Sequence, residues 1–309
     1  MKKICYLCNK NTKKFYSLRF YFYKCESCFS FFRSIEHKFN LFNFFKDTPL
    51  RIFSNYAKGK DQQFMYYKSL IEDYLNKKKI FSLEKVNFLK EFTKSNRNLK
   101  VIDIGGSPGI PASILKENNL VKDIVVTDYN EEIVKKMQSN LNLKSIKVDF
   151  DDLNLETFDE KFDLIILWNV IYYVKNIELF AQFINKISNE NTKIIIASPE
   201  PNFAVMTKFV IQENYPPYFF YHSNFLIDFF NKKSFAKEQI IFDKRNNIFE
   251  PYIASLKYSL LKNKKIKGYL YSLILFFIFF YYVLRNIFKT NLKLSSYKFT
   301  DFILVLKKK

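Results

Sequence analysis

Short apolar runs alternate with amphipathic stretches along the middle of the chain, which is the pattern of strands that alternate with helices. Between the first two runs, residues 111–118 are compatible with a helix. We therefore expect a doubly wound α/β fold. The expected buried strands lie at residues 99–104, 124–127, 145–148, 162–169 and 193–197, and two further apolar runs lie at 239–244 and 299–306.

The turn after the first run holds three of the five glycines in the chain, Gly105, Gly106 and Gly109. Glycine is favoured where the backbone takes a positive φ or where a ligand approaches closely, because a Cβ would be in the way. We expect the ligand site in this turn. Ser107 and Ile110 interrupt the dinucleotide pattern G-x-G-x-x-G, and no Gly-Lys-Ser/Thr follows to form a P-loop.

With Asp103 at the end of the run, the turn has the form D-x-G-x-x-x-G and resembles motif I of the class I S-adenosylmethionine (SAM) methyltransferases. Ser107 replaces the middle glycine of that motif. The resemblance covers residues 97–245 and a last strand at 299–306. It implies a seven-stranded Rossmann-like sheet whose last two strands pair antiparallel at the edge. The alternative is a glycine turn that only lets strand and helix pack.

The same resemblance implies where SAM would bind. The glycine turn would hold the methionine end, Asp128 the ribose hydroxyls, and Asp149 with its neighbour the adenine. Tyr129 could lie against the adenine ring, and Trp168 stands where the fourth strand opens onto the reacting methyl. The implied cofactor residues are Asp103, Gly105, Gly106, Ser107, Gly109, Asp128, Tyr129, Asp149, Phe150 and Trp168.

Three residues are candidates for catalysis. Many relatives carry Glu-His after the fourth strand, but this chain has Tyr172-Tyr173 there, so a histidine base at that place cannot be carried over. Asn169 ends the expected fourth strand, Tyr173 follows that strand, and His222 follows a dense aromatic run. A histidine near its ordinary pKa could deprotonate an acceptor hydroxyl. The alternative is that His222 caps the expected helix 223–231.

All four cysteines lie in two Cys-x-x-Cys pairs near the N-terminus: Cys5, Cys8, Cys25 and Cys28. Each pair offers two thiolates to one ion, and the sixteen residues between the pairs suit a β-hairpin. This spacing is typical of structural Zn²⁺, with an iron site or disulfides as alternatives. We expect metal binding to drive folding of the ribbon. The absence of an export signal favours a cytoplasmic protein.

We expect three regions: a zinc ribbon over residues 1–30, a helical linker over 31–98, and a SAM-binding domain over 99–309 with an apolar insertion at 248–297. Amphipathic helices are expected at 64–75 and 83–92, where they would cover the sheet or share in the substrate pocket. The arrangement resembles bacterial methyltransferases with an N-terminal four-cysteine ribbon, which act on sugars, glycan or lipid precursors, or other small metabolites.

The net charge of +20 suits a nucleic-acid or anionic-membrane partner. The alternative is a compositional bias, because the lysines are scattered along the chain and do not form one block. Residues 268–284 are uncharged, flanked by basic residues, and at the lower length limit of a membrane span. If the strands before and after this segment share one sheet, both ends of the segment must lie on the same side of a membrane. We expect peripheral contact of 262–289 with the anionic inner membrane face; a buried lid or dimer helix and a true span are the alternatives.

These observations predict a SAM-dependent methyltransferase with a structural zinc ribbon. Its expected acceptor is a small molecule, a sugar, or a glycan or lipid precursor. One alternative is a zinc-containing RNA base methyltransferase, for which the positive charge would supply phosphate contacts. Nucleic acid is the less favoured partner because the basic residues are diffuse. A second alternative is an inactive SAM-fold interaction module.

Overall fold

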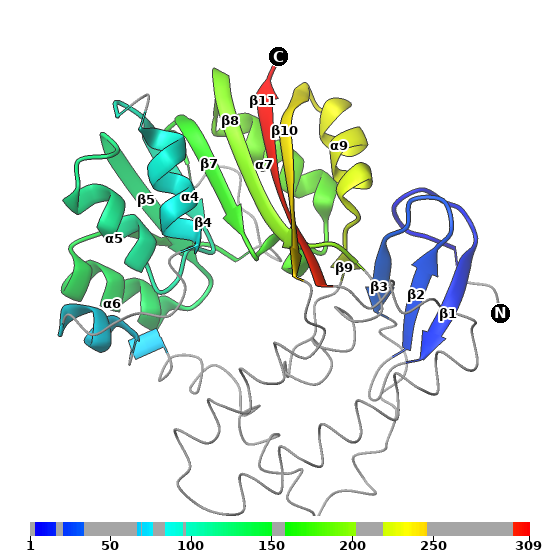
Figure 1. The fold of residues 1–309 in the computed structure, drawn as a ribbon, viewed down its shortest axis with the longest axis horizontal. Coiled ribbons are helices and arrows are strands. Elements are labelled where there is room, and N and C mark those ends of the chain that lie inside the picture. Colours follow the sequence, from blue (N-terminus) through cyan, green and yellow to red (C-terminus); the bar gives the residue numbers. More distant parts are fainter. Residues whose placement is uncertain are drawn as a thin grey trace, which may run out of the picture.

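A seven-stranded sheet forms the body of the molecule, and a small four-stranded sheet near the N-terminus lies beside it (Figure 1). The computed structural model describes residues 4–16, 21–33, 67–68, 70–76, 84–94, 97–149, 158–201, 219–245 and 299–309.

The large sheet has the strand order β10-β11-β8-β7-β4-β5-β6. Strands β6, β5, β4, β7 and β8 run parallel, whereas β11 is antiparallel to both β8 and β10. The order reverses at β4, which has β5 on one side and β7 on the other, and ligands bind at such switch points. The strands are β4 (Lys100–Ile104), β5 (Asp123–Asp128), β6 (Lys144–Lys147), β7 (Phe162–Trp168), β8 (Ser188–Pro199), β10 (Phe235–Arg245) and β11 (Phe299–Lys308).

This sheet confirms the predicted α/β Rossmann-like fold, including the antiparallel last pair of strands. Its two faces bury separate apolar clusters. Along β7, for example, Ile165 and Leu167 belong to one cluster, while Leu164 and Ile166 belong to the other. Burial on both faces explains why the central strands are continuous apolar runs rather than alternating ones.

Helices cover both faces of this sheet (Figure 1). The core of one face includes residues of α7 and α9, and the core of the other includes residues of α4, α5 and α6. The bounds are α4 (Glu84–Thr93), α5 (Ile110–Glu117), α6 (Glu131–Leu141), α7 (Ile177–Lys186) and α9 (Ser223–Asn231). Helix α6 begins where the Asn130 side chain accepts hydrogen bonds from two backbone N–H groups of the first turn, with two acidic residues beside them.

The small sheet combines the cysteine ribbon with a strand from much later in the chain. Its order is β1-β2-β3-β9, and all neighbours are antiparallel. The predicted hairpin between the cysteine pairs is present as β1 (Thr12–Tyr16) and β2 (Tyr21–Cys25). Strand β3 (Phe31–Arg33) then pairs with β9 (Phe219–Phe220), which joins the ribbon to the segment before α9.

Part of the expected linker is also helical. Residues 70–75 form a helix, and Ile71 and Leu89 lie in the same apolar cluster as α5 and α6. These two helical segments therefore cover one face of the large sheet. The predicted membrane-contacting range 262–289 and the whole insertion 248–297 lie outside the described residues. Within the described part, no helix combines the length and the apolar character needed to span a bilayer.

Candidate active site

The glycine turn lies at the carboxyl end of β4, at the switch point of the sheet. Gly105 has a φ of +66° and Gly109 a φ of +80°, a region that favours glycine. A Cβ at Gly105 would lie 2.5 Å from Val170 Cγ2, and one at Gly106 would overlap the carboxylate of Asp103. A side chain at Gly105 or Gly106 would therefore displace its neighbours in the turn.

Asp128 ends β5, next to the glycine turn. The turn is tied to this strand because Gly106 N–H donates to the Thr127 carbonyl at 3.1 Å. The Asp128 Oδ1 atom accepts a hydrogen bond from Asn130 N–H at 2.8 Å. Burial raises the pKa of the Asp128 carboxyl, and the nearby Ser107 hydroxyl opposes this effect only in part. A buried carboxylate with a raised pKa gains when a ligand brings hydrogen-bond donors to it.

The hydroxyl of Ser107, in the glycine turn near Asp128, is a second polar group of this region. Its Oγ is buried, and among the residues the structure describes it has no hydrogen-bond partner of good geometry. Buried polar atoms normally have a partner, so an orphaned hydroxyl in the turn suits a polar ligand. The predicted roles of the turn, Ser107 and Asp128 in binding the ribose and the methionine end of SAM stay predictions.

The sequence did not anticipate the environment of Asp103. Lys85, on the first turn of α4, places its Nζ atom 2.7 Å from both carboxylate oxygens of Asp103. The Asp103 side chain is 1% exposed and the Lys85 side chain 11% exposed, so the ion pair is buried beside the turn. Only the three-dimensional fold brings these two residues together, since they are 18 positions apart.

The expected adenine side is formed by the next two strand ends. Val148 N–H donates to the Asp128 carbonyl at 2.9 Å, which holds Asp149 beside the end of β5. Tyr129 is 39% exposed and Asp149 is exposed. Phe150 lies outside the described residues.

Asn169 and Trp168 lie at the carboxyl end of β7, between β4 and β8. Asn169 is exposed and has a φ of +58°, and its N–H donates to the Ala197 carbonyl at 2.9 Å. Trp168 is half-buried, with its ring 5.8 Å from that of Phe88 on α4. Tyr173 follows in a short 3-10 helix, η2 (Ile171–Tyr173), with its ring 4.7 Å from the buried Tyr172.

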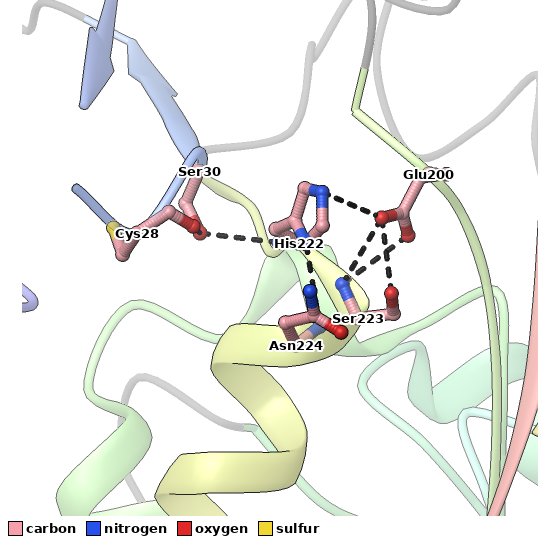
Figure 2. A network of polar contacts seen from close by, with 6 residues as sticks. All are labelled: Cys28, Ser30, Glu200, His222, Ser223 and Asn224. Carbon is pink, nitrogen blue, oxygen red and sulfur yellow. Dashed lines mark hydrogen bonds and ion pairs between the residues drawn. The ribbon is translucent and has the colours of Figure 1, made fainter. Parts of the chain in front are cut away.

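A carboxylate that sequence reasoning missed follows β8. Glu200 accepts hydrogen bonds from the Ser223 hydroxyl at 3.0 Å and from Ser223 N–H at 3.2 Å (Figure 2). His222 Nε2 lies 2.9 Å from Glu200 Oε1. Glu200 has the same relation to β8 that Asp128 has to β5, so its place after a buried strand was the available signal.

Both ring nitrogens of His222 have partners. While Nε2 faces Glu200, Nδ1 accepts a hydrogen bond from Asn224 N–H at 3.3 Å and so caps the first turn of α9. The structure thus contains the capping arrangement that was the alternative to a base. His222 as a general base stays a prediction, and it requires one of these two nitrogens to change its partner.

The four cysteines converge. Their Sγ atoms all lie within 4.8 Å of one another, and all four cysteines are free thiols. The Cys5–Cys28 and Cys8–Cys25 sulfur pairs are 3.7 and 3.3 Å apart. Zinc–sulfur bonds of about 2.3 Å in a tetrahedron place sulfurs roughly 3.8 Å apart, so the cluster matches a four-thiolate metal site.

The backbone around the cysteines also favours thiolates. Ser27 and Cys28 N–H groups each donate to Cys25 Sγ at 3.4 Å. The hydrogen bond from the Cys5 thiol lowers the pKa of Cys28 to about 5, and the same bond together with burial raises the pKa of Cys5. One member of that pair is therefore already disposed to ionise, as a metal ligand must.

Comparisons with known proteins agree with this geometry. The sequence profile described as "Methyltransferase domain" matches residues 77–238, just over half of the chain. Over 161 residues the chain is 32% identical to ribosomal RNA small subunit methyltransferase G of Mesoplasma florum. The match covers 47% of this chain and 67% of that relative.

Two solved structures illustrate the likeness in fold. Coclaurine N-methyltransferase bound to N-methylheliamine and S-adenosylhomocysteine is 12% identical, with a TM-score of 0.50 and 72% of each chain covered. The MccD protein is 13% identical, with a TM-score of 0.52, and the match covers 73% of this chain and 96% of that one. At these identities the likeness concerns the fold alone.

Proposed function

Because the chain belongs to the methyltransferase-domain family, it is a SAM-dependent methyltransferase, and we propose that its acceptor is a small molecule, a sugar, or a glycan or lipid precursor. The observation that carries this proposal is the row of groups along one sheet edge. The glycine turn follows β4, Asp128 ends β5, Asn169 follows β7 and Glu200 follows β8. The glycine turn and Asp128 would form the cofactor half of this row, and Asn169 and Glu200 would form the acceptor half.

The spacing of the row suits methyl transfer. Neighbouring strands lie about 4.8 Å apart, so the ends of β4 and β8 are roughly 10 Å from each other. Bound SAM supplies an electrophilic methyl on a positively charged sulfur; the methyl–sulfur bond breaks as a bond forms to the acceptor, which loses a proton. The residues of this chain align the two partners and exclude water, the main source of acceleration in such a reaction.

The acceptor half favours a ligand with hydrogen-bond donors. Glu200 is 14% exposed and lies beside His222 and Ser223, and its two carboxylate oxygens have lone pairs beyond those that these contacts use. A carboxylate there attracts a hydroxyl or an amine and repels a phosphodiester. Several lysines of the described part are also paired with acidic residues, which reduces the charge available to a polyanion: Lys85, Lys100, Lys144, Lys193 and Lys233.

A second candidate is methylation of an RNA base. The named activity of the Mesoplasma florum relative favours it, as does the net charge of +20. RNA binding releases counterions and weakens steeply with salt, whereas binding of a small neutral acceptor does not. The catalytically inactive module is the third reading, and it predicts cofactor binding without transfer.

We also propose that the four cysteines hold one structural Zn²⁺. The convergent sulfurs and the backbone N–H groups directed at them support this metal, since a four-thiolate tetrahedron leaves no open position for catalysis. Free thiols suit a reducing compartment, so the cytoplasm is the proposed location. Peripheral contact of 262–289 with anionic lipid is part of the same proposal and rests on sequence alone.

Transfer of a labelled methyl from SAM tests the acceptor class. Nucleotide sugars, lipid-linked glycans and small amines would be assayed beside ribosomal RNA, each at low and high salt. We expect label in a small acceptor at a rate that salt changes little. Label in RNA that disappears as salt rises would replace this proposal with the second candidate. Cofactor binding without any transfer would support the inactive module.

A further inference from the structure

We infer that Lys85 is a cofactor-binding residue whose ammonium pairs with the α-carboxylate of SAM, while Asp103 pairs with the α-ammonium. The inference rests on the proposed cofactor but not on the identity of the acceptor. It assigns a binding role to α4, a helix that the sequence predicted only as a cover or as a share of the substrate pocket.

The position of the pair supports this role. Asp103 is the next-to-last residue of β4, and a Cβ at Gly106 would overlap its Oδ2 atom, so the carboxylate lies directly against the turn. Lys85 Nζ lies 2.7 Å from both Oδ atoms. The cation and the anion of one buried pair are thus placed side by side at the methionine end of the expected site.

The charges of the pair complement those of the ligand. The methionine end of SAM is a zwitterion, with an ammonium and a carboxylate on one carbon. An adjacent lysine and aspartate can meet both groups at once, and the net charge of the site remains unchanged. An ammonium has three donors, and in the described ranges Asp103 is the partner that Lys85 contacts. A ligand carboxylate can therefore be added without first breaking the ion pair.

The energetics of a buried ion pair also favour a binding role for Lys85. Burying an ion pair costs desolvation that the attraction often fails to recover, so apolar residues would hold α4 on the sheet at least as well. Apolar contacts already hold α4, with Leu89 fully buried and the Phe88 ring against Trp168. A purely structural brace of α4 is the competing explanation, and it makes a different prediction about ligands.

The test is a double cycle of protein and ligand variants, read by isothermal titration. Wild type and Lys85→Met would each be titrated with SAM and with decarboxylated SAM, which keeps the ammonium, the sulfonium and the adenosine. Wild type should bind SAM at least about tenfold more tightly than decarboxylated SAM, because a charge-assisted pair is lost. In Lys85→Met that preference should vanish. Lys85→Arg, which keeps the cation, should restore most of it.

Each of four results would overturn the inference. The first is a wild-type preference for SAM that persists unchanged in Lys85→Met. The second is an equal loss of both ligands, accompanied by equally weakened binding of 5′-methylthioadenosine, which lacks the methionine end altogether; that outcome assigns Lys85 to bracing. Tighter SAM binding by Lys85→Met would mean that Lys85 competes with the cofactor. If wild type binds none of the three ligands, the proposed function fails first, and this inference fails with it.

Discussion

At the scale of single residues, Asp128 shows how the fold prepares a polar site. The carboxyl group is nearly buried, and this burial raises its pKa above the ordinary 3.8. When the folded pKa is above the unfolded one, the folded state holds more protons in the pH window between them, so stability decreases as pH rises through that window. The ionised carboxylate is therefore a stability cost of the free protein, and ribose hydroxyls that hydrogen-bond to it would offset that cost.

Asp128→Asn should consequently have opposite effects on stability and on binding. The free variant should unfold at the same or a higher temperature near neutral pH, since the buried charge is gone. SAM binding should weaken by roughly 1.5–3 kcal/mol for a lost charge-assisted hydrogen bond. Wild-type affinity should also fall as the solution is acidified through the raised pKa, and the variant should lack that dependence.

A matched control is available at the opposite edge of the sheet. Asp163 on β7 is half-buried, and it accepts hydrogen bonds from Lys100 N–H at 2.8 Å and Asn189 Nδ2 at 2.9 Å. Asp163→Asn should leave SAM binding and its pH dependence unchanged. Unchanged affinity in Asp128→Asn, measured by calorimetry across the pH range, would remove Asp128 from the cofactor site.

At the scale of elements, the pairing of β3 with β9 links the cysteine ribbon to the proposed acceptor half. Phe31 and Phe32 pair with Phe220 and Phe219, and Ser30 Oγ accepts a hydrogen bond from His222 N–H at 3.1 Å (Figure 2). The next residue of the same segment, Tyr221, is fully buried and donates to the Val174 carbonyl at 2.9 Å. The start of α9 is thus held between the ribbon and the loop after β7.

Removing the metal should loosen this segment and leave the cofactor half intact. After chelation, residues 219–226 should lose protection against amide hydrogen exchange, because their ribbon partners lose the site that orders them. The strands β4 and β5 should keep their protection. Ser30→Ala in the metal-loaded protein should reproduce only the local loss at His222. Equal exchange in metal-loaded and chelated protein would show that the ribbon is ordered without metal.

The sequence predicted elements better than it predicted their contacts. The strands and α9 were recognisable because buried strands require unbroken apolar runs and because the helix start carries a capping residue. The ion pair of Lys85 with Asp103 and the bond of Ser30 with His222 join residues 18 and 192 positions apart, so no local pattern reports them. Glu200 was visible as an acid after a strand, but its partners were not.

At the scale of the whole molecule, the topology explains why one edge carries the chemistry. The strand order reverses at β4, which leaves the glycine turn at the switch point, with Asp128 on one side and Asn169 and Glu200 on the other. The ribbon pairs with β9, and it lies on the side of the large sheet away from β4 and β5 (Figure 1). Cofactor binding and acceptor binding are therefore expected to be separable, the first governed by β4 and β5 and the second by β8, α9 and the ribbon.

The most direct test of this account is a calorimetric titration of the zinc-loaded protein with SAM and S-adenosylhomocysteine, together with Gly106→Val. We expect one-to-one, saturable binding of both ligands by wild type. Gly106→Val should lose it while keeping a cooperative thermal transition, because its side chain would overlap Asp103 in the turn. Absence of binding by the intact wild type, or equal binding by the variant, would contradict a cofactor site in the turn after β4.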